Sequence, residues 1–325
     1  MVIRIGKKII GQICSKGQRV TQSWSLWRNK QFLATQGRGP ETCRPIFVIG
    51  PPRCGSTLLY QAMTHYFKFS FFTNEMMNNP YAVPLYVHKH TSSVEYQSDF
   101  TSKHGITIGE SAPHEGWPFW RRFYPRDIHD YIADSQFLTE EKEVEIQNTI
   151  SFIINFYKRP FLAKNMEIGL RLKSIKKIFP NAVYIVMKRN PKAIASSLLA
   201  ARLKTHGSKS DWWSIRPATY DQLKNTSVSN QVICQISDIY KTICKDSLGL
   251  NVIDLSYEEL CASPTDALDG IADKLLKMGV KLSRTSNRLP PNFFINEEFI
   301  FSEKEEHEID ILLRDDHFLA NYMSK

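Results

Sequence analysis

The chain has 325 residues, of which 42% are hydrophobic and 23% charged, a balance typical of a globular protein with a sizeable core. No apolar run approaches the roughly 20 residues that span a bilayer, which argues against a membrane-spanning helix. The six cysteines contain no CxxC pair, which argues against a zinc finger. The 42 Lys and Arg outnumber the 33 Asp and Glu, and the net charge of +9 is compatible with an anionic ligand, a nucleic acid or an anionic membrane surface.

Residues 1–44 are predicted to form a basic lead-in to the folded domain. The first 20 residues, MVIRIGKKIIGQICSKGQRV, are basic but lack the continuous apolar stretch of a secretory signal. We expect a loosely ordered arm, with weak contact to a membrane surface through an amphipathic helix as the alternative. No basic run is interleaved with aromatic residues, which argues against a nucleic-acid partner. The cysteine usage predicts a reduced, cytoplasmic location.

Residues 45–325 are predicted to form a single domain built from strand–helix units. Three short apolar runs have the character of buried strands: Pro45–Gly50, Ala182–Met187 and Leu250–Leu255. Helical patterns follow them at Ser56–Phe67, from Pro191 and from Pro264. This alternation predicts an α/β fold of three layers, P-loop-like, with a central parallel sheet flanked by helices. Ligands of such sheets bind at the carboxyl ends of the strands.

Residues 68–137 form an aromatic-rich stretch that is interrupted by prolines and has no clear periodicity. A stretch of this length is usually an insertion or a binding region. Its aromatic cluster can line an apolar ligand pocket or simply pack in the core: Trp117, Phe119, Trp120, Phe123 and Tyr124. The pair Trp212 and Trp213 leaves the same choice between a lid over a ligand and plain packing. Thr139 is predicted to cap the helix that follows the insertion.

The first strand leads into a predicted phosphate-binding loop. The run from Gly50 to Thr57 has the length of the motif GxxxxG plus two residues, but Ser56 occupies the place of the lysine of a nucleotide-triphosphate loop. Gly55 lets backbone N–H groups approach an anion, the next helix adds partial positive charge, and Arg53 can hold two oxygens at once. No strand ends in an obvious magnesium-binding Asp. The loop therefore predicts a metal-free site for one phosphate that bears a transferable group.

A second anion site is predicted where the strand at 182–187 ends. Arg189, Asn190 and Pro191 follow this strand, and Ser197 lies eight residues after Arg189 along the helix. Arg189 and Ser197 are placed to bind one phosphate between them. Taken alone this pattern is weak, because Arg-x-Pro is common at helix starts.

Together, the two motifs resemble the PAPS-binding motifs of sulfotransferases, where PAPS is 3′-phosphoadenosine 5′-phosphosulfate. The loop PRCGSTLLYQ is similar to PRSGTTLLYQ of a large bacterial-type sulfotransferase family, which is related to the tyrosylprotein sulfotransferases. The resemblance covers residues 45–280 and continues through Trp120–Phe123, Phe179–Ala182, Asp211–Ser214 and Tyr257–Leu260. It implies a sulfotransferase that uses PAPS, releases PAP, and acts on a hydroxyl or amine of a small-molecule, carbohydrate, lipid or peptide acceptor.

The resemblance also implies the residues of the donor site. The 5′-phosphosulfate is expected to bind to Arg53, Cys54, Gly55, Ser56 and Thr57, the 3′-phosphate to Arg189 and Ser197, and the cofactor is also expected to contact Tyr257. Cys54 stands where the family has Ser. The glycine-rich C-terminal motif with which cytosolic sulfotransferases close over the 3′-phosphate is absent. We expect another segment to take that role, near Arg202 or Arg284.

The resemblance implies Glu75, Lys164 and Arg53 as catalytic residues. Lys164 and Asn165 occupy the place where cytosolic sulfotransferases have their Lys and His, so that base is missing. Glu75 lies 22 residues after Arg53, similar to the base of the tyrosylprotein branch, and Lys164 resembles the lysine that stabilises its leaving group. Rival bases are Glu110, Glu115, His104, His114 and His129. Two other functions stay open, a kinase-like phosphotransferase with a P-loop and a non-catalytic PAP-binding protein.

Overall fold

The computed structural model describes residues 21–35, 44–90, 96–102, 105–124, 138–295 and 298–323. Its centre is a four-stranded sheet in the order β2-β1-β3-β4, in which every neighbouring pair is parallel. The strands are β1 (Ile46–Ile49), β2 (Leu162–Lys164), β3 (Val183–Lys188) and β4 (Asn251–Ser256). The predicted parallel sheet is confirmed, and the three predicted strands begin and end within one residue of their expected bounds. The first three strands are buried throughout because helices cover both faces.

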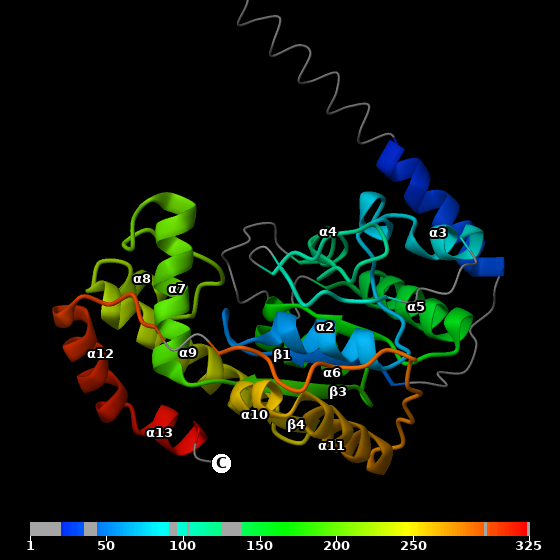
Figure 1. The fold of residues 1–325 in the computed structure, drawn as a ribbon. Coiled ribbons are helices and arrows are strands. Elements are labelled where there is room, and N and C mark those ends of the chain that lie inside the picture. The colour runs from blue at the N-terminus through cyan, green and yellow to red at the C-terminus, as the bar shows by residue number, and fades with distance from the viewer. Residues whose placement is uncertain are drawn as a thin grey trace, which may run out of the picture.

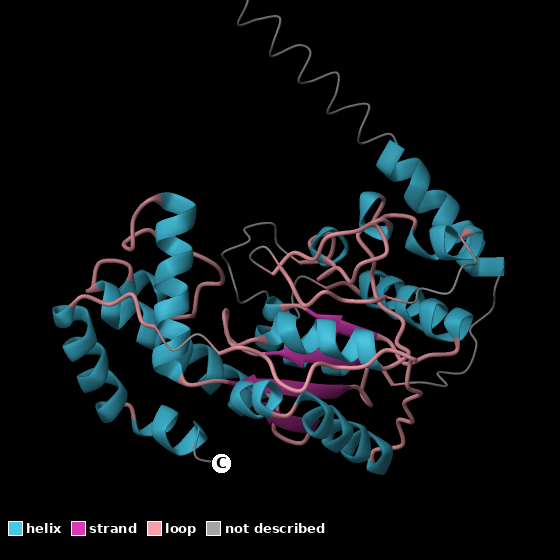
Figure 2. Ribbon diagram, viewed as in Figure 1, coloured by secondary structure: helices cyan, strands magenta, loops and turns pink. Residues whose placement is uncertain are grey.

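Helices on the two faces of the sheet complete the predicted three layers and confirm the α/β fold (Figures 1 and 2). In this view α2 (Ser56–Tyr66) and α11 (Pro264–Lys277) lie in front of the sheet, and α6 (Leu172–Ile178) and α9 (Val228–Asp246) lie behind it. The other elements are α5 (Glu140–Tyr157), α7 (Pro191–His206), α8 (Tyr220–Leu223), α10 (Tyr257–Ala262), α12 (Glu303–Asp315), α13 (His317–Met323) and the 3-10 helix η3 (Met166–Leu170). No helix of the described residues is both long and apolar enough to cross a bilayer.

Capping residues determine where the helices α7 and α10 begin, directly after the strands β3 and β4. Asn190 accepts hydrogen bonds from two N–H groups of the first turn of α7, and Pro191 is its first residue. Ser256 and Glu259 form a capping box that places Tyr257 at the first position of α10. Thr139 precedes α5 as predicted, but its side chain makes no capping hydrogen bond.

The aromatic stretch at 68–137 folds as short helices packed beside the sheet: η1 (Met76–Asn78), α3 (Val83–Lys89) and α4 (Trp117–Trp120). Phe119, Trp120, Phe123 and Tyr124 are buried in the hydrophobic core, and only Trp117 is partly exposed. Of the two interpretations of this cluster, core packing therefore describes the molecule. Residues 1–20 of the lead-in, residues 125–137 and the candidate bases at 104 and 129 lie outside the described residues.

Candidate active site

The predicted site residues gather at one edge of the sheet. The loop 50–55 follows β1, Lys164 ends β2, Arg189 follows β3 and Tyr257 follows β4. Because all four strands are parallel, their carboxyl ends lie along the same edge, which is where ligands bind in such sheets. The fold thus brings together segments that are far apart in the sequence.

The loop after β1 has a backbone that needs glycine at its end. Gly55 has a φ of 94°, in the left-handed region, and a Cβ added to it would overlap the ring of Tyr257. Arg53 also has a positive φ, 70°, which is uncommon for a residue with a side chain. Such strained residues cluster at binding sites. The helix α2 begins directly after Gly55, and its unpaired first N–H groups are a favourable site for an anion.

The two predicted anion motifs touch each other. Arg53 donates from Nε to Ser197 Oγ at 2.8 Å, and Arg189 donates from Nη1 to the carbonyl oxygen of Arg53 at 3.0 Å. The Arg189 guanidinium also lies over the Tyr257 ring, 4.2 Å from its centroid. The hydroxyl of Ser197 is thus engaged by the arginine of the first motif rather than by Arg189.

Two guanidinium groups held this close form a cationic centre. Burial, and then the charge of Arg189, lowers the pKa of Arg53. Arg189 Nε is buried and has no hydrogen-bond partner among the described residues. An anion held between the two side chains relieves their repulsion and satisfies the unpaired donor. The centre therefore fits a phosphate or a sulfate group.

A cavity of about 180 Å³ opens at this centre. It is lined by Arg53, Gly55, Ser56, Thr57, Leu58, Ser102, Gly105, Glu115, Lys164, Met166, Arg189, Trp213 and Tyr257. Lys164 is buried, and its Nζ forms an ion pair with Glu115 Oε1. A Cβ added to Gly105 would lie 3.0 Å from Glu115 Oε1, 3.5 Å from Thr57 Oγ1 and 3.6 Å from Lys164 Nζ. An acid, a lysine and a hydroxyl thus meet at one wall of the cavity.

Neighbouring groups hold Glu115 at this wall. Asn165 donates from Nδ2 to the carbonyl oxygen of Glu115 at 3.2 Å, and the Gly116 N–H donates to His114 Nδ1 at 2.8 Å. Burial lowers the pKa of His114 against the opposing charge of Glu115, which keeps Nδ1 free to accept. The Glu115 carboxylate can take a proton from a hydroxyl, while Lys164 stabilises negative charge beside it.

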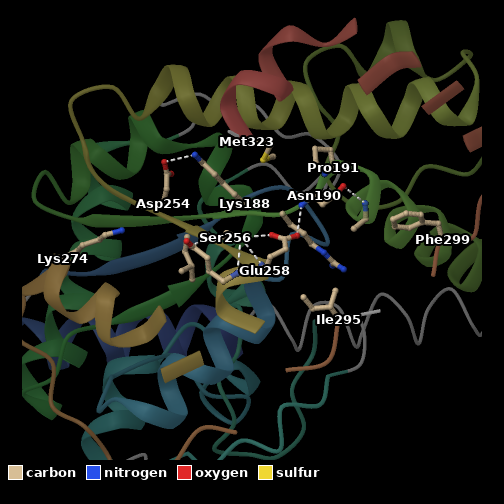
Figure 3. A pocket seen from close by; sticks show the side chains of 14 residues that line it. Lys188, Asn190, Pro191, Asp254, Ser256, Glu258, Lys274, Ile295, Phe299 and Met323 are labelled. Atoms are coloured by element: carbon tan, nitrogen blue, oxygen red, sulfur yellow. Dashed lines mark hydrogen bonds and ion pairs between the residues drawn. The ribbon is translucent and has the colours of Figure 1, made fainter. Parts of the chain in front are cut away.

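A larger cavity of about 960 Å³ adjoins the first, and Arg189 lines both. Figure 3 shows Asn190, Ser256 and Glu258 from the starts of α7 and α10, with Ile295 and Phe299 from the segment before α12. The Ile300 N–H donates to Ser196 Oγ at 3.0 Å and fastens this segment to α7. Ile295 and Phe299 therefore border the larger cavity from the C-terminal part of the chain, and no sequence motif marks them.

A segment near Arg202 or Arg284 was expected to close over the 3′-phosphate, and both arginines have other roles. Arg202 is fully buried and donates to Gln231 Oε1 at 2.7 Å. Arg284 pairs with Asp269 at 2.7 Å. Both arginines hold parts of the fold together, and neither is among the described residues that line the two cavities.

Glu75, the predicted base, has other neighbours. Burial, and then a hydrogen bond with the Glu75 carboxylate, raises the pKa of the Tyr86 hydroxyl. The Glu75 N–H donates to the carbonyl oxygen of Glu110 at 3.0 Å. Among the described residues that line the two cavities, neither of these two acids occurs. The structure brings Glu115 to Lys164 instead, and the base stays a prediction for each carboxylate.

Of the residues Cys54, Trp212 and Trp213, only Trp213 lines one of the two cavities. Cys54 is fully buried under the loop, its N–H donates to the carbonyl oxygen of Pro51 at 3.3 Å, and burial raises the pKa of its thiol. Its side chain belongs to the core. Trp213 lines the smaller cavity, whereas Trp212 packs over the Arg202 guanidinium, 4.8 Å from the ring centroid. In the part of the chain that the structure describes, no group of three or more His, Cys, Asp and Glu side chains is placed to hold a metal ion.

The chain matches one protein family and is similar to solved structures. The model of the sulfotransferase family matches residues 45–276. The chain is similar to the solved sulfotransferase STF1 from Mycobacterium tuberculosis H37Rv, at 15% identity and a TM-score of 0.47 over 81% of this chain and 73% of that one. It is also similar to the sulfotransferase STF9 from Mycobacterium avium, at 14% identity and a TM-score of 0.49 over 90% and 74% of the chains. No curated protein matches the chain.

Proposed function

The chain belongs to the sulfotransferase family, and from this membership we propose that it transfers a sulfuryl group from PAPS to a hydroxyl or amine of an acceptor. The observation that supports this donor best is the pair of adjacent guanidinium groups, Arg53 and Arg189, at the strand ends. One arginine belongs to the loop after β1 and the other to the end of β3, as the two anionic ends of PAPS require.

The cationic centre fits the charges of the donor. Arg53, with Ser56, Thr57 and the N–H groups of the loop, suits the 5′-phosphosulfate. The unpaired Nε of Arg189 suits the 3′-phosphate. Ser197 accepts from Arg53 and still has its own hydroxyl hydrogen to donate to a phosphate oxygen. The side chain of Cys54 faces the core, so it takes no part in this proposal.

The two cavities suit the two halves of a nucleotide. The smaller one is rich in cations and hydroxyls, and we assign the 5′-phosphosulfate to it. The larger one has an apolar wall made by Ile295 and Phe299, against which a nucleoside can pack. Arg189 lies at the junction of the two cavities, with its guanidinium stacked on Tyr257. Ile295 and Phe299 then contact the nucleoside on the side where cytosolic sulfotransferases use their glycine-rich motif.

The residues of the smaller cavity divide the chemistry between them. When bound, PAPS supplies an activated sulfuryl group, and the acceptor oxygen or nitrogen forms a bond to sulfur as the bond from sulfur to the 5′-phosphate oxygen breaks. A carboxylate of the chain removes the acceptor proton. Lys164, with Arg53, stabilises the negative charge that develops on the leaving phosphate. Burial of Lys164 strengthens this effect because little water screens its charge.

Glu115 is the carboxylate that the geometry favours for the proton. It shares the cavity wall with Lys164 and Thr57, and its backbone is held by Asn165. Its ion pair with Lys164 also keeps the lysine satisfied while the donor is absent. Glu75, the base implied by the resemblance, remains the alternative.

Transfer of radiolabelled sulfate from PAPS tests this function. Purified protein, incubated with PAPS and panels of phenols, sugars, lipids and peptides, is expected to yield a labelled product whose mass identifies the acceptor class. An Arg53→Ala variant is the inactive control. Binding of PAP is expected to be undiminished in EDTA, and binding of ATP with magnesium to be weaker. A strict magnesium requirement, or transfer of phosphate from ATP, would replace this proposal with the kinase-like alternative, and PAP binding without turnover would favour a non-catalytic protein.

The cytoplasmic location also stays a proposal, which rests on the cysteine usage of the sequence. Cys54, Cys234, Cys244 and Cys261 are free thiols in the structure. Fractionation of the native cell, followed by detection of the protein in the soluble and membrane fractions, tests this proposal.

A further inference from the structure

The positive charge of the chain is concentrated at its N-terminal end. Residues 1–44 hold nine Lys and Arg and one acidic residue, Glu41, so they carry +8 of the net charge of +9. The proposed donor site lies entirely after residue 50, in the part of the chain where opposite charges nearly cancel. The excess charge of the chain is therefore not explained by an anionic nucleotide.

The helix at 21–35 is attached to the domain by one face. Ser25 accepts a hydrogen bond from Asn79, and Asn29 is buried and accepts one from the N–H of Leu85 in α3, both at 3.3 Å. The Phe32 ring packs against rings of α3 and α5, at centroid distances of 4.8 and 5.4 Å. These three positions are spaced by four and three residues and share one face. The helix therefore has a defined outward side.

That outward side carries two exposed tryptophans. Trp24 and Trp27 lie three positions apart, and each is 58% exposed. The guanidinium of Arg28 lies over the Trp24 ring, 4.7 Å from its centroid. Tryptophan has an apolar body and a polar N–H, so it is favoured where a membrane meets water. Two indoles flanked by basic residues are the combination that interfacial helices use.

A loop next to the smaller cavity adds two more exposed apolar side chains. Ile106 is 66% exposed and Ile108 is 82% exposed, while Thr107 between them is buried and donates to a backbone carbonyl. Gly105, which begins this loop, lines the smaller cavity. Asn74 holds the loop by donating to the carbonyl oxygens of residues 107 and 109 at 2.9 and 2.7 Å.

The helix and the loop are neighbours on the molecule. Asn74 binds the loop and Asn79 binds the helix. Asn79 lies five residues after Asn74, a distance along the chain that can span at most about 18 Å. Figure 1 shows the helix at 21–35 and the loops around α4 on the same side of the sheet, with α11 on the opposite side. One surface thus joins Arg28 and the two tryptophans of the helix to the rim of the site.

We propose that this surface, formed by the helix at 21–35 with Trp24 and Trp27 and by the loop with Ile106 and Ile108, binds the surface of an anionic membrane. The charge of +8 is complementary to anionic headgroups, and its attraction acts over about a Debye length. The four apolar side chains enter the interfacial layer once the charge has brought them there. The inference rests on charge and exposure, and it holds whether or not the donor is PAPS.

Sedimentation of the full chain with vesicles tests this inference. We expect the wild type to sediment with vesicles in which about a third of the phosphatidylcholine is replaced by phosphatidylglycerol, and not with vesicles of phosphatidylcholine alone. The variant Trp24→Ala/Trp27→Ala is expected to bind roughly tenfold or more weakly, because apolar area no longer enters the interface. The matched control is Leu276→Ala on α11, where the leucine is 57% exposed and binding is expected to be unchanged. Raising the salt from about 0.01 M to 0.15 M shortens the Debye length from about 30 to 8 Å and is expected to weaken binding.

The vesicle experiments test the role of charge and the role of the tryptophans separately. Wild-type protein that sediments equally with neutral and anionic vesicles would overturn the role of charge. A double variant that binds like the wild type would overturn the role of the tryptophans. The melting temperature and the PAP affinity of the double variant are expected to equal those of the wild type, so that weaker vesicle binding reports the surface and neither misfolding nor loss of the donor site.

Discussion

Replacing Arg189 with alanine tests the donor site directly, because this side chain joins the two cavities. The substitution removes the hydrogen bond to the carbonyl of Arg53, the stacking on Tyr257 and the proposed contact with a 3′-phosphate. The first two contacts exist whatever nucleotide is bound. Only the third depends on the 3′-phosphate, so two nucleotides that differ in this group separate the effects.

The size of each loss follows from the kind of contact. A charge-assisted hydrogen bond contributes about 1.5–3 kcal/mol, which corresponds to about 10- to 150-fold weaker PAP binding at ~1.4 kcal/mol per factor of ten. The cation–π contact with Tyr257 contributes about 0.5–1 kcal/mol. Its loss is expected to weaken both nucleotides by about two- to fivefold. Adenosine 5′-phosphate, which differs from PAP only in lacking the 3′-phosphate, is expected to show only this smaller loss.

Titration calorimetry of both nucleotides measures these losses. Lys192→Ala is the matched control, because Lys192 lies three residues further along and its charge is taken up by Glu306 and Asp310, at 2.9 and 2.7 Å. We expect this control to bind both nucleotides like the wild type. Equal losses for the two nucleotides in Arg189→Ala would show that Arg189 does not contact the 3′-phosphate. An equally large loss in Lys192→Ala would show that a diffuse positive field, and no particular contact, holds the nucleotide.

Three further predictions concern the catalytic wall, the loop and the pH dependence of stability. Glu115→Gln is expected to keep PAP affinity and to lower kcat by roughly 10²–10⁴-fold, with Glu75→Gln near the wild-type rate; the reverse order in a transfer assay would return the base to Glu75. Gly55→Ala is expected to abolish PAP binding because of the overlap at its Cβ, whereas Gly270→Ala, with nothing within 4 Å of its Cβ, is expected to keep binding and to stabilise the protein by about 0.5–1 kcal/mol. Intact PAP binding by Gly55→Ala would contradict the description of the loop. His114 has its pKa lowered by burial, so the unfolded chain takes up the proton first and the free energy of unfolding is expected to fall as the pH drops below 6.5. His114→Asn is expected to flatten this part of the urea-denaturation profile, and an unchanged profile would refute the role of His114.

The sequence by itself predicted the elements whose signals are local. Three short apolar runs between helical patterns predicted buried strands, and they placed β1, β3 and β4 to within one residue of their bounds. The remaining strand, β2, lies at one edge of the sheet and is only three residues long, too short to show a strand pattern in the sequence. The loop at 50–55 and the start of α7 were likewise predicted, because glycine, proline and capping side chains act on their nearest neighbours.

Only the tertiary structure decided which side chains meet. The resemblance implied Glu75 as the base and left Glu110 and Glu115 as rivals. The structure decides that Glu115 is the partner of Lys164, because Asn165, next to Lys164, holds the backbone of Glu115. The tertiary structure also decided the role of Cys54, whose side chain packs in the core although Arg53 and Gly55 line the cavity. Such pairings join residues far apart along the chain, and they depend on the packing of the whole domain, which no local pattern of residues encodes.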